Sequence, residues 1–279
     1  MDVFEKIKDI SAFAAQAREQ GLTIGFVPTM GALHEGHLSL VKKAIAENDI
    51  VIASIFVNPI QFNNPEDLAK YPRVIDKDLA LLQKEGVHAV FTPSVEEMYP
   101  ETVSDAYNLG SLSSVMEGKF RPGHFNGVAV VVHKFFLIIQ PHKAYFGEKD
   151  YQQLLIIKAM VRNYNIPVEI VGCPINREAD GLARSSRNSR LSPQMKEAAP
   201  FIHQQLVEAS KLAKELTAEK LAIYVISAFE KHPLLKLEYF AIADGDTLEL
   251  IKGKITENSY GFIAVYAGDI RLIDNIRLI

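Results

Sequence analysis

The feature that most constrains the fold is an alternation of apolar runs with amphipathic stretches through the first 175 residues. Residues 50–57 read IVIASIFV, a run typical of a parallel strand covered on both faces. Further strands are expected at similar runs, over 23–27, 87–92, 143–146 and 168–172. Helices are expected around them, over 3–19, 36–47, 73–85, 125–140 and 150–164. This order predicts an α/β fold with a Rossmann-like, doubly wound, largely parallel sheet.

The pattern changes after residue 175, where helices come before strands. Two helices are expected over 194–213 and 217–231, followed by strands over 235–243, 260–267 and 269–278. The sequence therefore predicts a Rossmann-like domain over residues 1–175 and a smaller α+β domain over residues 176–279. Residues 93–127 of the first domain are rich in glycine and proline and are expected to be mainly loop.

Charge and cysteine content limit the class of protein. The net charge of −4 and the pI near 6.1 argue against a dedicated nucleic-acid surface. The single cysteine, Cys173, excludes an intramolecular disulfide and a CxxC metal site. The N-terminal stretch carries acidic residues and no apolar core of a signal peptide. The longest apolar stretch, 128–139, is too short to span a bilayer. A cytoplasmic protein is expected.

Two histidines follow the strand that is expected over residues 23–27 of the Rossmann-like domain. His34 and His37 lie three residues apart at the expected start of a helix, so both face the same side. Helix N-termini favour anions, and imidazoles can donate hydrogen bonds to phosphate oxygens. The preceding loop lacks both GxGxxG and GxxxxGK[ST] spacing. A triphosphate site is one interpretation, and solvated helix-start residues are the other. A metal site is disfavoured because HEGH lacks an i, i+4 histidine pair.

Three further polar groups fall at expected loops or helix starts. They are Gln61 with Asn58 and Asn63, Lys149 and Asp150 with Gln153, and the run 184–188. The histidines and the first two of these groups each follow a strand, so they should meet along one edge of the sheet. The run 184–188 opens the second domain, which can act as a lid over bound phosphates. Each group also has a structural interpretation: Gln61 can be solvent-facing, and Asp150 or Ser185 can cap a helix.

Other conspicuous residues are expected to be structural. Cys173 ends a buried strand without an obvious base, which disfavours a nucleophilic role. His133 and His142 are also interpreted as structural.

Five segments, in this order along the chain, resemble the pantothenate synthetase (pantoate–β-alanine ligase) family. They read PTMGALHEGH (28–37), FVNPIQF (56–62), RPGHFNGVAVVV (121–132), FGEKDYQQL (146–154) and READGLARSSRN (177–188). The first resembles that family's version of the HIGH motif of adenylate-forming nucleotidyltransferases. The resemblance covers essentially the whole chain.

The resemblance implies a two-step ligase reaction. ATP and the carboxylate of (R)-pantoate would give pantoyl adenylate and pyrophosphate, and the amine of β-alanine would then displace AMP to form pantothenate. In-line attack of this kind needs positioning and charge neutralisation rather than a protein nucleophile. The resemblance also implies Mg²⁺ bound through ATP rather than through protein side chains, and a homodimer formed through the first domain.

Site roles carry over by matching position. His34, His37, Lys149 and Arg187 would be catalytic, with His37 as a proton donor, and Gln61 and Gln153 would bind pantoate, Gln61 also lying near β-alanine. The other residues expected at the nucleotide are Met30, Gly31, Ala32, Leu33, Glu35, Gly36, Gly147, Glu148, Asp150, Asn176, Arg184, Ser185 and Ser186.

The chain departs from the family pattern at two positions. Arg184 stands where the family usually has methionine, which adds a charge beside the phosphate loop. Asn176 stands where it usually has valine, which puts a polar group where an apolar contact to adenine is expected. Neither change removes a group that the reaction needs.

Three alternative functions remain open from the sequence. A nucleotidyltransferase of the same fold, acting on another acid or phosphate acceptor, would explain the histidines but not Gln61 and Gln153. A tRNA-charging enzyme shares the motif, yet this chain shows no recognisable anticodon-binding module. A nucleotide sensor without turnover is a different class of protein, and no loss of catalytic groups favours it.

Overall fold

The computed structural model describes residues 1–101 and 106–279, and its chain divides into two compact units. The first unit comprises Met1–Glu148 and Gln153–Pro174, and the second comprises Lys149–Gln152 and Ile175–Ile279. Of the expected loop region 93–127, residues 102–105 lie outside the described part of the chain. Helices α1 to α7 belong to the first unit, and α8 begins in the second unit and continues in the first. Their bounds are α1 Ile7–Glu19, α2 Glu35–Glu47, α3 Pro65–Ala69, α4 Ile75–Glu85, α5 Val95–Met98, α6 Met116–Phe120, α7 His124–Ile139 and α8 Tyr151–Asn163.

The first unit contains a parallel sheet of six strands in the order β1-β4-β3-β2-β5-β6. The central strand β2 pairs in parallel with β3 on one side and with β5 on the other. This arrangement confirms the predicted doubly wound, parallel sheet. The strands are β1 Asp2–Phe4, β2 Ile24–Thr29, β3 Ile50–Ile55, β4 Ala89–Phe91, β5 Lys143–Gly147 and β6 Glu169–Cys173.

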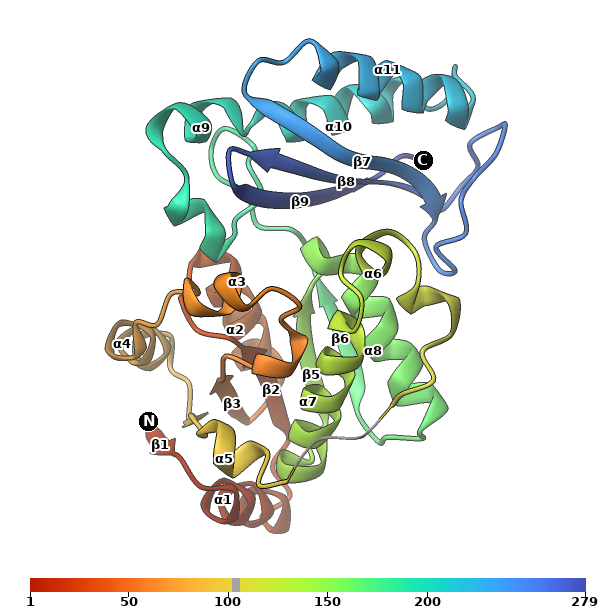
Figure 1. Ribbon diagram of the computed structural model, residues 1–279. Helices are drawn as coiled ribbons and strands as arrows, with labels where there is room; N and C mark the ends of the chain where they lie inside the picture. Colours follow the sequence, from red (N-terminus) through yellow and green to blue (C-terminus); the bar gives the residue numbers. More distant parts are fainter. Residues whose placement is uncertain (102–105) are drawn as a thin grey trace. The chain divides into compact units, whose positions relative to one another are not determined.

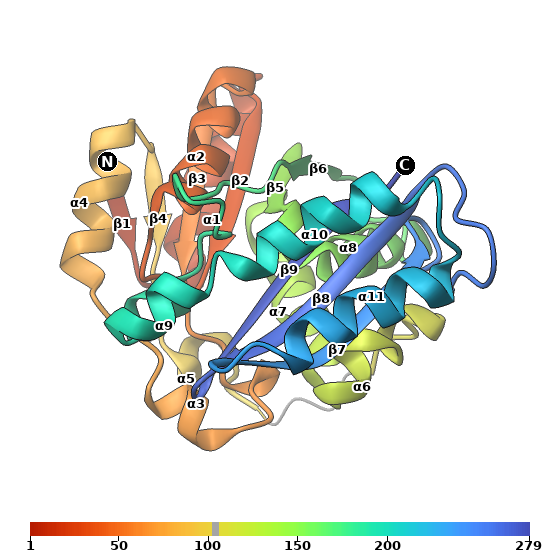
Figure 2. The same ribbon diagram turned by 90° about the horizontal axis from the view of Figure 1, so that it is seen from above.

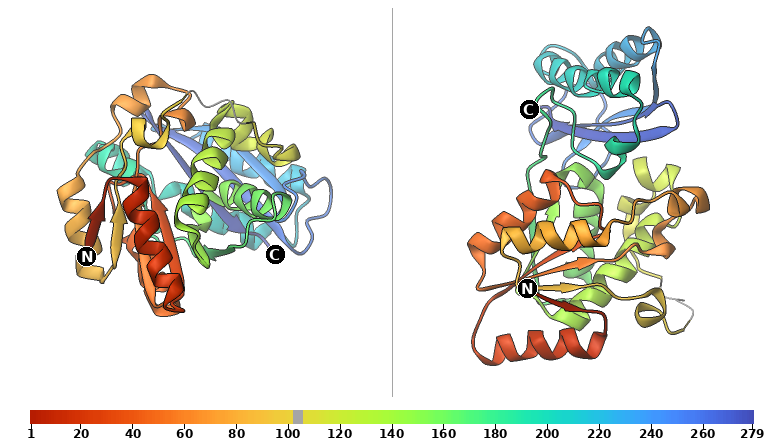
Figure 3. Two further views of the ribbon diagram at one scale, coloured as in Figure 1. Left: turned by 90° about the horizontal axis from the view of Figure 1, so that it is seen from below. Right: turned by 90° about the vertical axis from the view of Figure 1, so that its left-hand side faces the viewer.

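Two apolar cores cover the two faces of this sheet, and helices lie on both sides of it (Figure 3). Side chains of a strand alternate between faces, so the fully buried Phe26 and Val27 of β2 enter different cores. One core includes residues of α1, α7 and α8, and the other includes residues of α2 and α4. Burial on both faces explains why β3 reads as a continuous apolar run.

The second unit contains an antiparallel sheet in the order β7-β8-β9, formed by Leu235–Asp244, Ser259–Ala267 and Ile270–Arg277. Helices α10 (Phe201–Leu212) and α11 (Ala218–Glu230) lie along one face of this sheet (Figure 1), and Figure 2 shows them side by side. Their buried side chains share one apolar core with the strands. The predicted α+β character of this region is confirmed.

Three sequence expectations are corrected by the structure. The helix expected over 3–19 begins at Ile7, because Asp2–Phe4 forms a strand that pairs with β4. The helix expected over 194–213 is interrupted at Pro200, which lacks the backbone N–H that a continuous helix requires, and it is replaced by α9 (Pro193–Ala198) and α10. The expected loop over 93–127 contains the short helices α5 and α6.

Among the described residues, no helix is both long enough and apolar enough to cross a membrane.

Candidate active site

Three of the predicted groups of site residues follow the neighbouring strands β3, β2 and β5 along the chain. Strand β2 leads into the turn at Met30–Leu33 and then into α2, while β3 leads into the short 3₁₀ helix Pro59–Gln61. Strand β5 leads into Glu148–Asp150 and then into α8, which contains Gln153. These strands are adjacent and parallel, so the segments that follow them start from the same edge of the sheet.

His34 and His37 form a reciprocal cap at the start of α2. The Nδ1 atom of His34 accepts the Gly36 backbone N–H at 3.1 Å, and Nδ1 of His37 faces the His34 backbone N–H at 3.4 Å. The two rings lie 4.1 Å apart. Because both Nδ1 atoms act as acceptors, each neutral ring carries its proton on Nε2. The cap therefore selects the tautomer in which Nε2 is a hydrogen-bond donor.

The turn before this cap is held by Asp78 of α4. Its carboxylate accepts the backbone N–H groups of Ala32 and Leu33, each at 2.8 Å. Gly31 has a φ of +77°, and a Cβ atom there would lie 2.9 Å from Asp78 Oδ2, so only glycine allows this close approach. Asp78 is 1% exposed, and burial raises its pKa, although the two backbone donors act in the opposite direction.

Sequence reasoning missed Asp78 because it lies in an expected amphipathic helix, far from the turn along the chain. The spacing did offer one signal: Asp78 stands four residues before Leu82, on the same face of a helix. In the structure Asp78 is buried, whereas Asp76 in the same turn is exposed. A carboxylate at a buried helix position requires hydrogen-bonding partners, which here are the two backbone N–H groups of the turn.

Gln61 is buried and its amide is oriented by neighbours on both sides. It is 7% exposed. Its Nε2 donates to the sulfur of Met30 at 3.1 Å, and its Oε1 accepts from Asn58 Nδ2 at 3.1 Å. Tyr99 in turn donates to Asn58 Oδ1 at 2.9 Å. The structure thus brings Met30, Gln61 and Asn58 together, whereas Asn63, which was grouped with them from the sequence, is exposed.

The backbone of Gln61 is supported by the start of α7. The Nδ1–H group of His124 donates to the Gln61 carbonyl oxygen at 2.8 Å, and Arg121 Nη1 donates to His124 Nε2 at 3.1 Å. A Cβ atom at Gly127 would lie 2.5 Å from the Ile60 carbonyl oxygen, so this glycine permits the close approach of α7 to the 3₁₀ helix. The RPGHFNG segment therefore shapes the Gln61 region.

In the second unit, Lys149 and Asp150 are in contact with each other. Lys149 Nζ donates to Asp150 Oδ1 at 3.3 Å, and the lysine side chain is 19% exposed. The following residue, Tyr151, stacks on Tyr260 of β8 with ring centroids 4.6 Å apart. This segment is therefore held against the C-terminal sheet of its own unit.

The loop with Arg184, Ser185, Ser186 and Arg187 has an ordered local structure. It begins with a turn closed by an antiparallel bridge between Arg177 and Ala183. Ser185 then caps the 3₁₀ helix Ser186–Arg190 by accepting the Arg187 backbone N–H at 3.3 Å. The expected capping role of this run is confirmed.

Asn176 and Arg184, the two positions at which the chain is expected to differ from the family, lie close together. The backbone N–H of Arg184 donates to the Asn176 carbonyl oxygen at 3.0 Å. The Arg184 guanidinium lies 3.8 Å from a carboxylate oxygen of Glu178. The added positive charge is therefore accompanied by a negative charge from the same loop.

The residues that were interpreted as structural from the sequence also have defined surroundings. Of the residues interpreted as structural, His142 accepts the Ile24 backbone N–H at 2.9 Å, and His133 Nδ1 lies 2.6 Å from the Tyr107 hydroxyl oxygen. Burial raises the pKa of the Cys173 thiol to about 11, which disfavours the reactive thiolate. Among the residues expected at the nucleotide, Glu35 and Gly36 begin α2, Gly147 ends β5 and Glu148 begins the 3₁₀ helix Glu148–Asp150.

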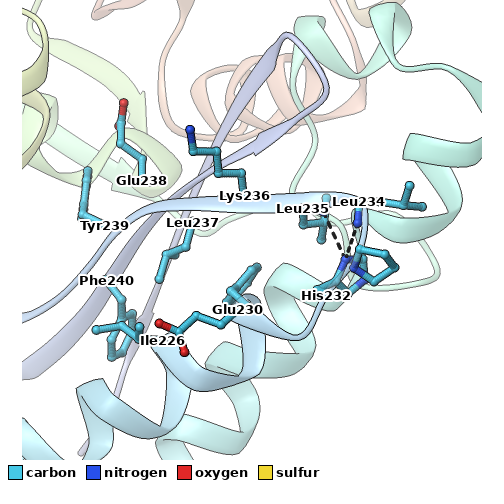
Figure 4. Close-up of a pocket in the computed structure, with 12 residues that line it drawn as sticks. Ile226, Glu230, His232, Leu234, Leu235, Lys236, Leu237, Glu238, Tyr239 and Phe240 are labelled. Carbon is cyan, nitrogen blue, oxygen red and sulfur yellow. Dashed lines mark hydrogen bonds between the residues drawn. The ribbon is translucent and has the colours of Figure 1, made fainter.

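A separate pocket of about 660 Å³ lies in the second unit between α11 and β7 (Figure 4). Its lining includes Ile226, Glu230, Phe240 and His232, and His232 accepts the backbone N–H groups of Leu234 and Leu235 at 3.3 and 3.1 Å. None of the predicted site residues lines this pocket. The described residues hold no group of three or more His, Cys, Asp or Glu side chains suited to a metal ion.

Comparisons with known proteins agree over the whole chain. A family model described as pantoate-beta-alanine ligase matches residues 2–277. The chain is similar to pantothenate synthetases of Porphyromonas gingivalis, at 50% identity over 278 residues, and of Phocaeicola vulgatus, at 52% over 279 residues, with 99% of each chain covered in both cases.

Two solved structures are also similar to this chain. Pantothenate synthetase from Thermus thermophilus has a TM-score of 0.93 and 44% identity, covering 100% of this chain and 99% of that chain. Pantoate-beta-alanine ligase from Francisella tularensis, complexed with beta-gamma ATP and beta-alanine, has a TM-score of 0.84 and 38% identity, covering 100% and 98% of the two chains.

Proposed function

This chain belongs to the pantoate–β-alanine ligase family, and we propose that its reaction passes through pantoyl adenylate. The protein is an ATP-dependent ligase that condenses pantoate with β-alanine. In the first step a pantoate carboxylate oxygen attacks the α-phosphorus of ATP, and pyrophosphate leaves. In the second step the β-alanine amine attacks the acyl carbon, AMP leaves, and the amine loses a proton as the amide forms.

The capped turn at the start of α2 is the observation that carries this proposal. The turn over residues 30–33 leads into the N-terminus of α2, and the Nδ1 acceptors of His34 and His37 leave Nε2 as the donor in each neutral ring. We propose that these donors bind ATP phosphate oxygens and that His37 also donates a proton to the leaving pyrophosphate. Such donors stabilise charge that develops in the transition state.

In the second unit, we propose that Lys149, Ser185, Ser186 and Arg187 bind ATP phosphates. Lysine contributes a compact charge and arginine a planar set of donors, and both suit phosphate oxygens. Asp150, on the same segment, is proposed to bind the ribose.

Gln61 and Gln153 are proposed to bind pantoate. An amide donates and accepts at once, so it can bind a hydroxyl and a carboxylate without repelling either. The orientation of Gln61 between Met30 and Asn58 supports this role, because the substrate meets an amide that is already ordered.

Mg²⁺, dimerisation and location form the remainder of the proposal. Mg²⁺ prefers oxygen ligands and retains several waters, and the nucleotide-binding side chains proposed here are mainly nitrogen donors. Phosphate oxygens therefore suit Mg²⁺ better than the protein side chains do, and an ion bound there would neutralise phosphate charge.

Family membership supports a homodimer, and a single buried cysteine fits a reducing cytoplasm.

ATP–pyrophosphate exchange tests the intermediate directly. With ATP, Mg²⁺ and pantoate but no β-alanine, we expect label to pass from pyrophosphate into ATP, and AMP to be released only when β-alanine is added. His37→Ala should lower the exchange rate at saturating substrates. Exchange that requires β-alanine, or a labelled acyl-enzyme, would contradict the proposal.

A further inference from the structure

The segment that carries Lys149 is attached to the C-terminal sheet through two contacts. Asn275 of β9 donates from Nδ2 to the Lys149 carbonyl oxygen at 3.0 Å. Tyr151 stacks on Tyr260 and lies 5.8 Å from the ring of Phe262, both on β8. Residues Lys149–Gln152 accordingly belong to the second unit although the chain on both sides of them belongs to the first.

Strand β9 also binds the start of the loop over residues 177–188. Arg177 donates two hydrogen bonds to the Asp274 carboxylate, at 2.6 and 2.9 Å, and Asp274 is 4% exposed. A bidentate guanidinium–carboxylate pair fixes orientation as well as distance. His203 lies 4.0 Å from Asp274, and burial lowers its pKa, so at neutral pH Arg177 is the charged partner of this carboxylate.

Asn275 connects the two attachments. Its backbone N–H donates to Asp274 Oδ1 at 2.8 Å, and its carbonyl oxygen accepts from Arg177 Nη2 at 3.4 Å. Its side chain donates to Lys149, and the residue is 4% exposed. One buried residue of β9 thus contacts both the Lys149 segment and the residue that begins the phosphate loop.

We propose that Asn275 is a positioning residue for adenylation, fixing the Lys149 backbone relative to the loop that carries Arg187. The inference rests on the proposed function, in which both cations bind ATP phosphates. Lysine has a long flexible side chain, so where its ammonium can reach is decided by where its backbone is held. Misplacing a catalytic group by about 1 Å can lower a rate by roughly 100-fold.

A double-mutant cycle on pantoate-dependent ATP–pyrophosphate exchange tests this role. We expect Asn275→Ala to lower the maximal exchange rate by about 10- to 100-fold, with little change in KM for pantoate, whose proposed contacts lie elsewhere. In a Lys149→Ala background the same substitution should cause no further loss, because its effect passes through Lys149. Asn275→Leu, which fills the volume but cannot donate, should behave like Asn275→Ala.

Arg271→Ala is the matched control. Arg271 lies on the same strand and bonds Glu238 of β7 at 2.8 Å, so its loss perturbs β9 without touching the Lys149 segment. We expect it to lower the melting temperature while leaving the exchange rate within about 3-fold of the wild-type rate. Equal losses in Arg271→Ala and Asn275→Ala would indicate a merely structural role and overturn the inference.

The remaining outcomes separate this inference from the proposed function. Multiplicative losses in Lys149→Ala with Asn275→Ala, or wild-type exchange in both folded Asn275 variants, would overturn the inference while leaving the role of Lys149 intact. Wild-type exchange in Lys149→Ala would overturn the proposed role of Lys149 and the inference with it.

Discussion

The Asp78 carboxylate lies 2.8 Å from the backbone nitrogen of Ala32. The residues belong to separate elements, since Asp78 is in the first half of α4 and Ala32 is in the turn before α2. Ala32 itself has a φ of +50°, a left-handed conformation that non-glycine residues seldom adopt. Tertiary hydrogen bonds therefore stabilise a backbone shape that the local sequence alone disfavours.

Asp78→Asn should loosen this turn. An asparagine keeps one acceptor oxygen but presents an NH₂ group to the second backbone N–H, which leaves a buried donor without a partner. We expect the free energy of unfolding to fall by about 1–3 kcal/mol and KM for ATP to rise. Denaturant unfolding and steady-state kinetics measure the two effects. Asp76→Asn, an exposed residue of the same helical turn, is the control and should change neither quantity.

Asp78 should also leave a signature in the pH dependence of stability. Its pKa is raised by burial above the ordinary value of 3.8, so the folded state holds this proton more tightly than the unfolded state. The proton-linked part of its contribution to stability is therefore complete below pH 3.8 and is lost as the pH rises through the raised pKa, while the hydrogen bonds to the turn persist. Subtracting the unfolding profile of Asp78→Asn from that of the wild type should reveal this downward slope. A slope of opposite sign would show that the backbone donors outweigh burial.

Glu47 should show the opposite dependence. Hydrogen bonds from Lys43 and Tyr145 lower its pKa from 4.5 to about 2. Its contribution to stability is therefore present above pH 4.5 and is lost as the pH falls toward 2. We expect Glu47→Gln to flatten the acid limb of the unfolding profile between these values. Glu66→Gln, in an exposed pair with Lys70, is the control for the removal of a surface carboxylate.

Two substitutions of His34 separate its capping role from its proposed catalytic role. Asparagine is a good N-cap and alanine is a poor one, with a difference of about 0.5–2 kcal/mol. His34→Asn should therefore unfold nearly as the wild type does, whereas His34→Ala should lose stability of this size. Both lack the imidazole donor, so both should lower the rate of pyrophosphate exchange. Wild-type exchange in His34→Asn would limit His34 to a structural role.

Arg184→Met tests one of the two expected differences from the family, in the loop that is proposed to bind ATP phosphates. The guanidinium shares its charge with Glu178 at 3.8 Å, and part-exposed pairs of this kind contribute about 0–1 kcal/mol. We expect KM for ATP to change by less than about 5-fold, the equivalent of 1 kcal/mol. Glu178→Gln removes the negative partner and leaves the Arg184 guanidinium in place. A fall in KM for ATP in this variant would show that the Arg184 charge acts on the phosphates. A large rise in KM for Arg184→Met would indicate direct phosphate contact.

Much of the fold could be predicted because its signals are local. The apolar runs and their spacing indicated the parallel sheet. The polar residues that follow β2, β3 and β5 along the chain indicated the segments proposed to form the site. The errors had two causes. Strand β1 has three residues, and its pairing partner β4 lies more than 80 residues away. Pro200 divides a stretch whose apolar periodicity continues through it.

The sequence by itself determined the order of helices and strands, the family motifs and the identity of the residues proposed to meet ATP and pantoate. Only the tertiary structure decided how these residues are held. Asp78 under the turn, Met30 against Gln61, and Asn275 against Lys149 join residues 46, 31 and 126 positions apart. Periodicity reports which side chains are buried, but a buried polar group finds its partner through the folded backbone. That pairing depends on geometry created only when distant elements meet.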